Sequence, residues 1–385
     1  MQNSLRYFAM KSLRNEDSVK SKYYRIKLKT LGPIFIGSGE KLNKKEYIYN
    51  PSKKTVIIPD FVKMYEDIKK NNHEKDFQKF IMGYNKDLYK WLCDYGYNES
   101  IYSKWTRYTL DCGDAILEKG KTSEVLSFVK DPYNIPYIPG SSLKGMLRTI
   151  LLSNDILNNR LYDSYASKLK NDSKYPKGNY YLSNNIREIE TECYNILDKN
   201  SKVKENAVND IMSGVIISDS KPLKVDDLVL CQKCDKHTDG NVRNLPILRE
   251  CIKPGVTIEF NMEIREETGI TKDIITDAVK NFSELYYKNV ISKYDRNIKT
   301  SSDMVWLGGG VGFHSKTVIN ALFKNYEDGF NVTDNIMKNT LNRNYFKHKH
   351  NHDYREMVSP HILKVTKYKG IMYQMGCSKM EIVDL

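Results

Sequence analysis

The 385-residue sequence contains no long hydrophobic run. No apolar stretch approaches the roughly 18 residues that a membrane-spanning helix requires, so the pattern excludes a membrane protein. Residues 1–24 carry charges throughout and lack the apolar core and the small-residue cleavage site of a secretory signal. No repeat with a period of about 20 to 50 residues is visible, which argues against a solenoid. We therefore expect a cytoplasmic globular protein with one large domain or two modest ones.

Cysteine is also sparse. The seven cysteines are an odd number and are scattered along the chain, unlike the dense, even frameworks of small secreted domains. Cys231, Cys234 and His237 form a CxxCxxH pattern whose ligand types suit zinc, with Cys251 or another histidine as a candidate fourth ligand. We favour the alternative, a strand with two incidental thiols, and we predict no metal and no cofactor. The HKHNH run at 348–352 is interpreted first as an exposed basic loop.

Positive charge is in excess. The chain has 61 lysines and arginines against 48 aspartates and glutamates, which gives a formal net charge of +13. Lysine and arginine gain affinity for phosphates by releasing condensed counterions, so the balance indicates a polyanionic partner. Two alternatives remain open, because basic surfaces also serve solubility and protein contacts, and part of the excess can reflect an AT-rich genome.

Several segments alternate as strands do. Residues 23–36 alternate apolar and basic side chains and run into a glycine-containing loop, which predicts a half-buried strand. Residues 44–50 and 53–60 predict a hairpin with Pro51 and Ser52 in its turn. Further strands are predicted at 214–220, 227–232, 256–266, 361–368 and 371–383.

Helical spacing separates these strands. It predicts a helical insertion over about 60–130, a helix over 141–153 capped by Ser141 or Ser142, a mostly helical region over 155–210, and an amphipathic helix over 271–290 with Thr271 as its cap. This order indicates an α+β fold of ferredoxin-like, RRM-type units, with antiparallel sheets and helical insertions. We favour two halves, residues 1–210 and 211–385, over a single interrupted unit.

The glycine-rich segment at 307–317 fails two nucleotide-binding tests. A Walker A loop needs a glycine before its lysine, but Lys316 follows Ser315. The GxGxxG pattern counted from Gly308 meets Phe313 where its last glycine is required. We interpret the segment as a loop whose backbone can approach a phosphodiester, with Phe313 and His314 available to stack and Lys316 to neutralise charge. The alternative is a mobile surface loop.

Two earlier loops have related features. Residues 137–149 place Pro139 and Gly140 before a helix start where hydroxyls and cations could form an anion site. A purely structural cap is the alternative there. The loop at 37–39 either passes its backbone close to RNA or only turns the chain.

These segments occur in a recognisable order: IGSGE at 36–40, IPGSSLKGMLRT at 138–149, LPILRECIKPGVTIEF at 245–260, GGGVGFHSKT at 308–317, and a terminal strand pair. In this order the chain resembles the CRISPR RAMP superfamily. More closely, it resembles the subunit at the guide-RNA 3′ end of the type III-A (Csm) effector complex. The resemblance covers most of the chain.

The resemblance implies a function and a set of contacts. The function would be non-catalytic binding of the guide RNA (crRNA) 3′ region, supporting crRNA maturation and complex assembly in antiviral defence. The partners would be the guide RNA and neighbouring Csm-type RAMP subunits, with host ribonucleases as further candidates. The RNA contacts would be Gly37, Ser38, Gly39, Ser141, Ser142, Lys144, Arg148, Gly308, Gly309, Gly310, Gly312, Phe313, His314, Ser315 and Lys316.

Two alternatives belong to other functional classes. Some relatives cleave RNA, so the chain could be a metal-independent endoribonuclease with His314 as its acid or base. It could also be an adaptor that docks proteins and meets RNA incidentally.

Overall fold

The computed structural model describes residues 20–83, 87–115, 124–178, 180–197, 199, 202–295 and 301–385. Most of the segment in which we expected no secretory signal, residues 1–19, lies outside this range. Within the described ranges, no helix combines the length and the apolar character that crossing a membrane requires.

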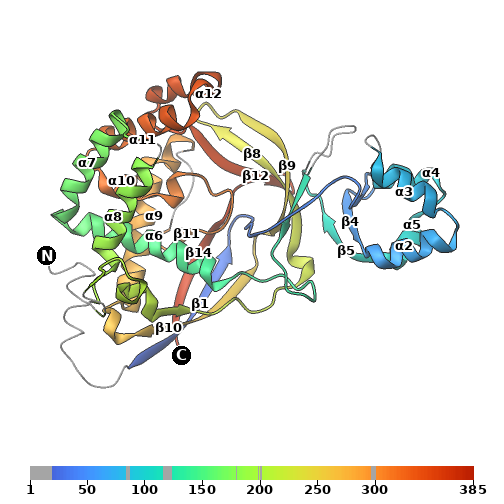
Figure 1. Cartoon of the computed structure of the whole chain (residues 1–385), viewed down its shortest axis with the longest axis horizontal. Coiled ribbons are helices and arrows are strands. Elements are labelled where there is room, and N and C mark those ends of the chain that lie inside the picture. Colours follow the sequence, from blue (N-terminus) through green and yellow to red (C-terminus); the bar gives the residue numbers. More distant parts are fainter. Residues whose placement is uncertain are drawn as a thin grey trace.

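A five-stranded antiparallel sheet forms the first part of the fold (Figure 1). Its strand order is β11 (Met304–Trp306), β14 (Cys377–Asp384), β1 (Ser21–Thr30), β10 (Thr257–Arg265) and β7 (Val215–Ile217). Helix α6 (Gly140–Asn158) lies between β1 and β7 in the sequence, and α9 (Lys272–Asn289) lies between β10 and β14. The two helices pack on each other. The resulting strand–helix–strand–strand–helix–strand unit confirms the expected ferredoxin-like, α+β architecture.

The pattern of β1 explains why it is central. Tyr24, Ile26 and Leu28 are buried and alternate with basic residues, so one face enters the core. Ile26 lies opposite Phe260 on β10 and opposite Ile382 on β14. Burial of such side chains on both flanks stabilises the sheet by roughly 1.5–3 kcal/mol for each large apolar residue.

Strands from both halves of the chain build this unit. β1 and α6 precede residue 210, whereas β7, β10, α9 and β14 follow it. The expected halves, 1–210 and 211–385, therefore share one sheet instead of forming a sheet each.

A second, strongly curved sheet grows from insertions into this unit. Its order is β2 (Gly37–Leu42), β6 (Glu124–Phe128), β9 (Val242–Ile252), β8 (Leu228–His237), β5 (Thr106–Asp111), β4 (Thr55–Pro59) and β3 (Ile48–Asn50). β12 (Ile362–Tyr368) pairs with the end of β8 and with β13 (Ile371–Gln374). Its pairs are antiparallel, except that β5 with β8 and β6 with β9 are parallel.

A helical module projects from this second sheet (Figure 1). It contains α2 (Phe61–Lys70), α3 (Glu74–Met82), α4 (Leu88–Asp94) and α5 (Glu99–Tyr102) around a separate aromatic core that includes Phe77, Phe80, Trp91 and Trp105. The expected insertion is thus confirmed up to Tyr102, but helix beyond that residue is wrong. β5 and β6 follow instead, because these short segments find strand partners that are distant in the sequence.

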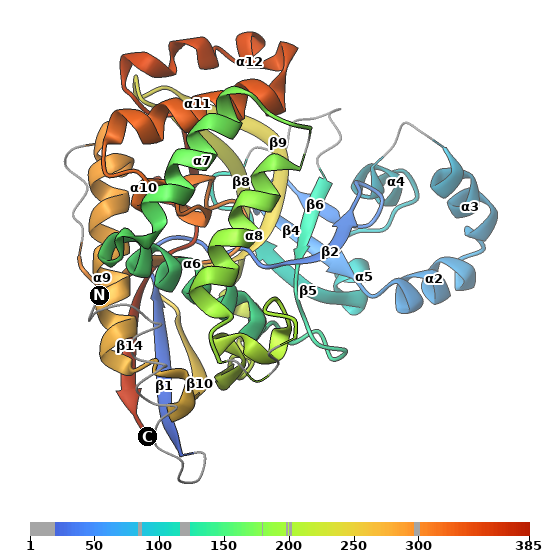
Figure 2. The ribbon, with the colours of Figure 1, turned by 60° about the vertical axis from the view of Figure 1, so that its left-hand side comes forward.

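The remaining helices cover one side of the molecule (Figure 2). They are α7 (Asp163–Lys174), α8 (Tyr181–Tyr194), α10 (Ile319–Leu322), α11 (Tyr326–Leu341) and α12 (Arg343–Lys347). α7 packs against both α8 and α11, and α10 packs against α6. The predicted Thr271 cap of α9 is confirmed, since its hydroxyl accepts a hydrogen bond from the Ile274 amide at 3.2 Å.

Candidate nucleic-acid interface

The glycine-rich loop packs against the segment that follows β1. The Gly309 amide donates a hydrogen bond to the Phe35 carbonyl oxygen at 2.7 Å. A Cβ atom at Gly308 would lie 2.3 Å from the same oxygen. Gly308, Gly310 and Gly312 have positive φ angles, which residues with a Cβ rarely adopt. Packing within the protein therefore requires glycine here.

Phe35 brings two of the sequence motifs together. The ring is buried, and a Cβ atom at Gly37 would lie 3.0 Å from it. The expected loop at 37–39 is the start of β2, whose residues Gly37, Ser38 and Gly39 are exposed. The Ser38 hydroxyl donates a hydrogen bond to the Ser127 carbonyl at 3.3 Å. The start of β2 and the glycine-rich loop thus border each other around this ring.

A group of cations lies beside the two loops. The Arg249 guanidinium on β9 lies 5.1 Å from the centre of the Phe35 ring, and a Cβ atom at Gly310 would lie 2.1 Å from its Nη1. Lys364 on β12 passes Gly312, since its Cγ would lie 3.6 Å from a Cβ there. We call Lys233, Arg249, Lys316 and Lys364 the basic cluster.

The basic cluster has more positive charge than its surroundings compensate. Burial, followed by the charges of Lys364 and Arg249, lowers the pKa of Lys233, and Asp235 only partly opposes this. Burial and then Arg249 lower the pKa of Lys316. Asp235 forms an ion pair with Lys364 at 2.8 Å. The Nε of Arg249 is buried without a hydrogen-bond partner among the described residues. Such a desolvated group of cations favours an external anion.

Sequence reasoning found one member of this cluster, Lys316, and missed three. Lys233, Arg249 and Lys364 lie on β8, β9 and β12, and the pairing of β8 with both neighbours brings these strands side by side. Arg249 does fall within the LPILRE stretch that carried the family resemblance. No local pattern distinguishes the other two lysines from solvated ones.

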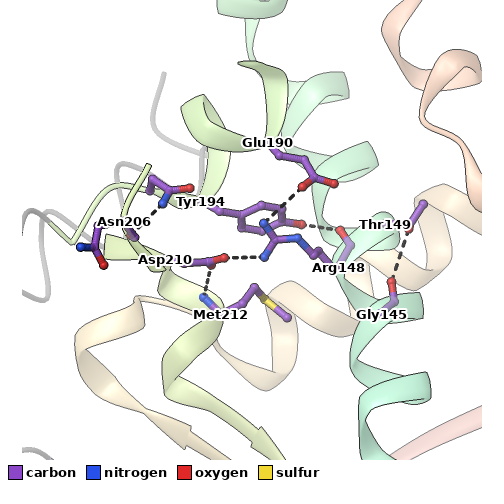
Figure 3. A network of polar contacts seen from close by, with 9 residues as sticks. Gly145, Arg148, Thr149, Glu190, Tyr194, Asn206, Asp210 and Met212 are labelled. Carbon is purple, nitrogen blue, oxygen red and sulfur yellow. Dashed lines mark hydrogen bonds and ion pairs between the residues drawn. The ribbon is translucent and has the colours of Figure 1, made fainter. Parts of the chain in front are cut away.

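The second sequence motif has different neighbours. Arg148 forms ion pairs with Asp210 at 2.7 Å and with Glu190 at 3.5 Å, and its guanidinium stacks 4.0 Å from the centre of the Tyr194 ring (Figure 3). The Tyr194 hydroxyl also donates a hydrogen bond to the Arg148 carbonyl. Arg148 therefore joins α6 to α8 and to the segment before β7. Its predicted RNA contact is not tested by these observations, and its internal partners favour a structural role instead.

The expected serine cap of α6 is wrong. The helix begins at Gly140, with Pro139 as its cap residue, so Ser141 and Ser142 lie inside the first turn. The Gly140 amide donates a hydrogen bond to the Asp219 carboxylate at 2.8 Å, which replaces a serine cap. A Cβ atom at Gly140 would lie 2.2 Å from the Ile217 carbonyl oxygen, so the start of the helix packs directly against β7 and has no room for a side chain there.

His314 and Ser315 lie inside the protein. His314 is 8% exposed, and burial lowers its pKa to about 4. The Ser315 hydroxyl donates a hydrogen bond to the Val311 carbonyl at 3.1 Å. These two side chains pack inside the loop, whereas Lys316 reaches the surface and is only partly desolvated by its neighbours. A histidine with this pKa is neutral at neutral pH, so it carries no charge toward RNA.

Cys231 and Cys234 are buried in different packing clusters, and Cys231 packs with Cys251. The Cys234 thiol donates a hydrogen bond to the Asn244 side-chain oxygen at 3.2 Å, and burial raises its pKa to about 11. The two cysteines and His237 do not converge as one ligand set. Within the described ranges, the side chains of metal-ligand type that converge are His350, Asp353 and His361.

The sequence matches a known family and several relatives. The family model described as RAMP superfamily matches residues 27–316. The CRISPR system Cms protein Csm5 of Mycobacterium tuberculosis is 28% identical, over 94% of this chain and 98% of that protein. The protein of the same name from Streptococcus thermophilus is 28% identical, over 89% of this chain and 88% of that protein.

Solved structures share the fold. A chain in the cryo-EM structure of a Csm–crRNA–target RNA ternary complex of a type III-A CRISPR-Cas system has a TM-score of 0.64 and 19% identity, and the match covers 93% of this chain and 100% of that one. The crystal structure of Csm5 from T. onnurineus has a TM-score of 0.58 and 18% identity, and the match covers 92% of this chain and 99% of that one.

Proposed function

Since the chain belongs to the RAMP superfamily, we propose that it is a non-catalytic, crRNA-binding subunit of a type III-A CRISPR effector complex. The relatives named Csm5 support this role, because they match over nearly the whole length of the chain. In this role the chain binds the 3′ region of the guide RNA and supports crRNA maturation and complex assembly in antiviral defence. Its partners are neighbouring Csm subunits, with host ribonucleases as candidates for recruitment.

The observation that carries the proposal is the basic cluster beside the two glycine loops. Among the described residues, the carboxylate that acts on Lys233, Arg249 and Lys364 is Asp235, and it already forms an ion pair with Lys364. Cations of this kind bind phosphates without reading bases, which suits a guide whose sequence varies. The exposed residues 37–39 extend the same surface, and the Phe313 ring beside it is half-buried.

The remaining predicted contacts belong to α6. Ser141 is exposed and Lys144 is half-buried. Burial lowers the pKa of Lys144, Asp210 partly opposes this, and Arg148 adds to it. We assign the phosphates first to the basic cluster and treat Ser141, Ser142 and Lys144 as a secondary contact.

The non-catalytic assignment has its own support. His314 is the histidine of the glycine-rich loop, and burial holds its pKa far below neutrality, where it is a poor general acid.

The test is RNA binding by the purified chain over a salt series. The variant Arg249→Ala/Lys316→Ala removes two charges from the basic cluster, and Lys69→Ala/Lys70→Ala removes two exposed charges from α2 as a matched control. We expect the first variant to bind a crRNA 3′ fragment about tenfold or more weakly, with a plot of log affinity against log salt that is shallower by roughly 1 to 2. The control should bind like the wild type.

Each other outcome points to a different function. Cleavage of the RNA by the wild-type chain without added metal would favour the endoribonuclease. Equal binding by both variants would remove the basic cluster from the interface and favour the protein-docking adaptor.

A further inference from the structure

Three buried side chains of metal-ligand type meet where the segment after α12 returns to the second sheet. His350 and Asp353 belong to the 3₁₀ segment His350–Arg355, and His361 directly precedes β12. One ligand atom from each lies within 4.8 Å of the other two. The His350 Nδ1 lies 3.1 Å from the Asp353 carboxylate, and the His361 Nδ1 also hydrogen-bonds that carboxylate.

These side chains are shielded from water. The Asp353 side chain has no exposed surface, the His350 side chain is 5% exposed, and the His361 side chain is 13% exposed. A carboxylate in such a place is costly unless a positive charge compensates it. His350 and His361 give Asp353 hydrogen bonds, and a divalent cation bound among the same three side chains would neutralise the carboxylate charge.

A third histidine lies next to the group. His237 ends β8, and its ring centre is 5.0 Å from that of His361. The pairing of β8 with β12 sets this position, because His237 lies opposite Ile362, the residue after His361. The ring centres of His350 and His361 are 4.9 Å apart. The three histidines and the aspartate thus come from three separate stretches of the chain.

Another buried nitrogen borders the same place. His314 lies against the Ser359 backbone and within range of the Asp353 charge. Its Nε2 is buried without a hydrogen-bond partner among the described residues. At least one imidazole nitrogen beside the group, His314 Nε2, is therefore not used in a hydrogen bond among the described residues.

We propose that His350, Asp353 and His361, with His237 as the fourth ligand, form a structural zinc site. Two or three imidazoles with one carboxylate suit zinc or a similar first-row transition metal, whereas magnesium and calcium prefer oxygen ligands. Zinc ligands in a tetrahedral site lie roughly 3.3 Å apart. The ligand atoms of the three side chains already lie within 4.8 Å of one another, so small rotations would bring them to that separation. The site fastens the segment after α12 to the ends of β8 and β12, the strands that carry Lys233 and Lys364.

The test uses the full chain, purified without a histidine tag, and zinc as the probe. The protein is incubated with Zn²⁺, passed over a desalting column and analysed for metal content by mass spectrometry. The variant His350→Ala/His361→Ala removes two ligands. The variant His348→Ala/His352→Ala is a matched control, because these two histidines are exposed in the same short segment.

We expect about one zinc per chain for the wild type and the control, and near-complete loss of zinc for His350→Ala/His361→Ala. Cobalt substitution should give the intense visible absorption of a four-coordinate site, and Asp353→Asn should change that spectrum even if the double variant does not fold. A wild-type chain that retains no zinc, or a control variant that loses it while His350→Ala/His361→Ala keeps it, would overturn the proposal.

Discussion

Arg148 and Arg249 both lie over aromatic rings, yet their surroundings shift their pKa values in opposite directions. Arg148 lies over Tyr194 and has two carboxylate partners, Asp210 and Glu190. Burial alone would lower its pKa, but its partners, led by Asp210, raise it overall. Arg249 lies over Phe35, and burial lowers its pKa. Charges within the fold therefore hold Arg148, whereas the desolvated surroundings of Arg249 would favour an anion from outside.

The same contrast holds between neighbouring residues of β9. Glu250 follows Arg249 and points into the protein, where its side chain has no exposed surface. It accepts hydrogen bonds from the Tyr108 hydroxyl at 2.6 Å and the Phe128 amide at 2.8 Å, and it pairs with Lys130. Paired charge thus lies on one face of the strand and unpaired charge on the other.

The largest expected effect follows from this buried pair. Glu250→Ala should lower the free energy of unfolding by about 3–5 kcal/mol, because it leaves the Lys130 ammonium buried without its partner. Urea denaturation followed by circular dichroism measures this. Lys53→Ala, which removes an exposed ion pair with Glu99, should change the stability by less than about 1 kcal/mol. A Glu250→Ala loss below about 1 kcal/mol would mean that the pair is not buried as described.

The next effect separates the two arginines. Arg148→Ala should cost about 1–3 kcal/mol of stability, a value reduced by partial exposure of the ion pairs, and should leave the salt dependence of RNA binding unchanged. Arg249→Ala should change stability by less than about 1 kcal/mol, because relief of repulsion offsets the lost stacking, and should weaken RNA binding. The measurements are urea denaturation and the salt series on each single variant. If Arg148→Ala weakens RNA binding as much as Arg249→Ala, the contrast between the two sites fails.

The parts of the fold that could be predicted from sequence are those with long, regular patterns. Apolar residues alternate along β1 and β10 and recur at helical spacing along α9, and the structure confirms all three elements. β5 and β6 could not be found, because each has only five or six residues and is stabilised by partners far away in the sequence. Propensity over so short a segment is weaker than the pairing that the tertiary fold provides.

The residues of the candidate site likewise fall into those that the sequence could predict and those that it could not. Lys316 could be predicted because it adjoins the glycine motif. Lys233, Arg249 and Lys364 could not, since only the pairing of β8 with β9 and β12 brings them together. The contact of Phe35 with both glycine loops was equally invisible, because it depends on how the chain turns after β1 rather than on a local pattern.

The smallest expected effect tests the two helix starts. Thr271→Ala should cost about 1 kcal/mol, because the Thr271 hydroxyl caps α9 by accepting from the Ile274 amide. Ser142→Ala should change stability by less than about 0.5 kcal/mol, because Pro139 and Asp219 already define the start of α6. Thermal denaturation of both variants, with the same probe, resolves this difference. A cost of about 1 kcal/mol for Ser142→Ala would restore a serine cap at α6, whereas a neutral Ser142→Ala that weakens RNA binding would place this hydroxyl at the phosphate backbone.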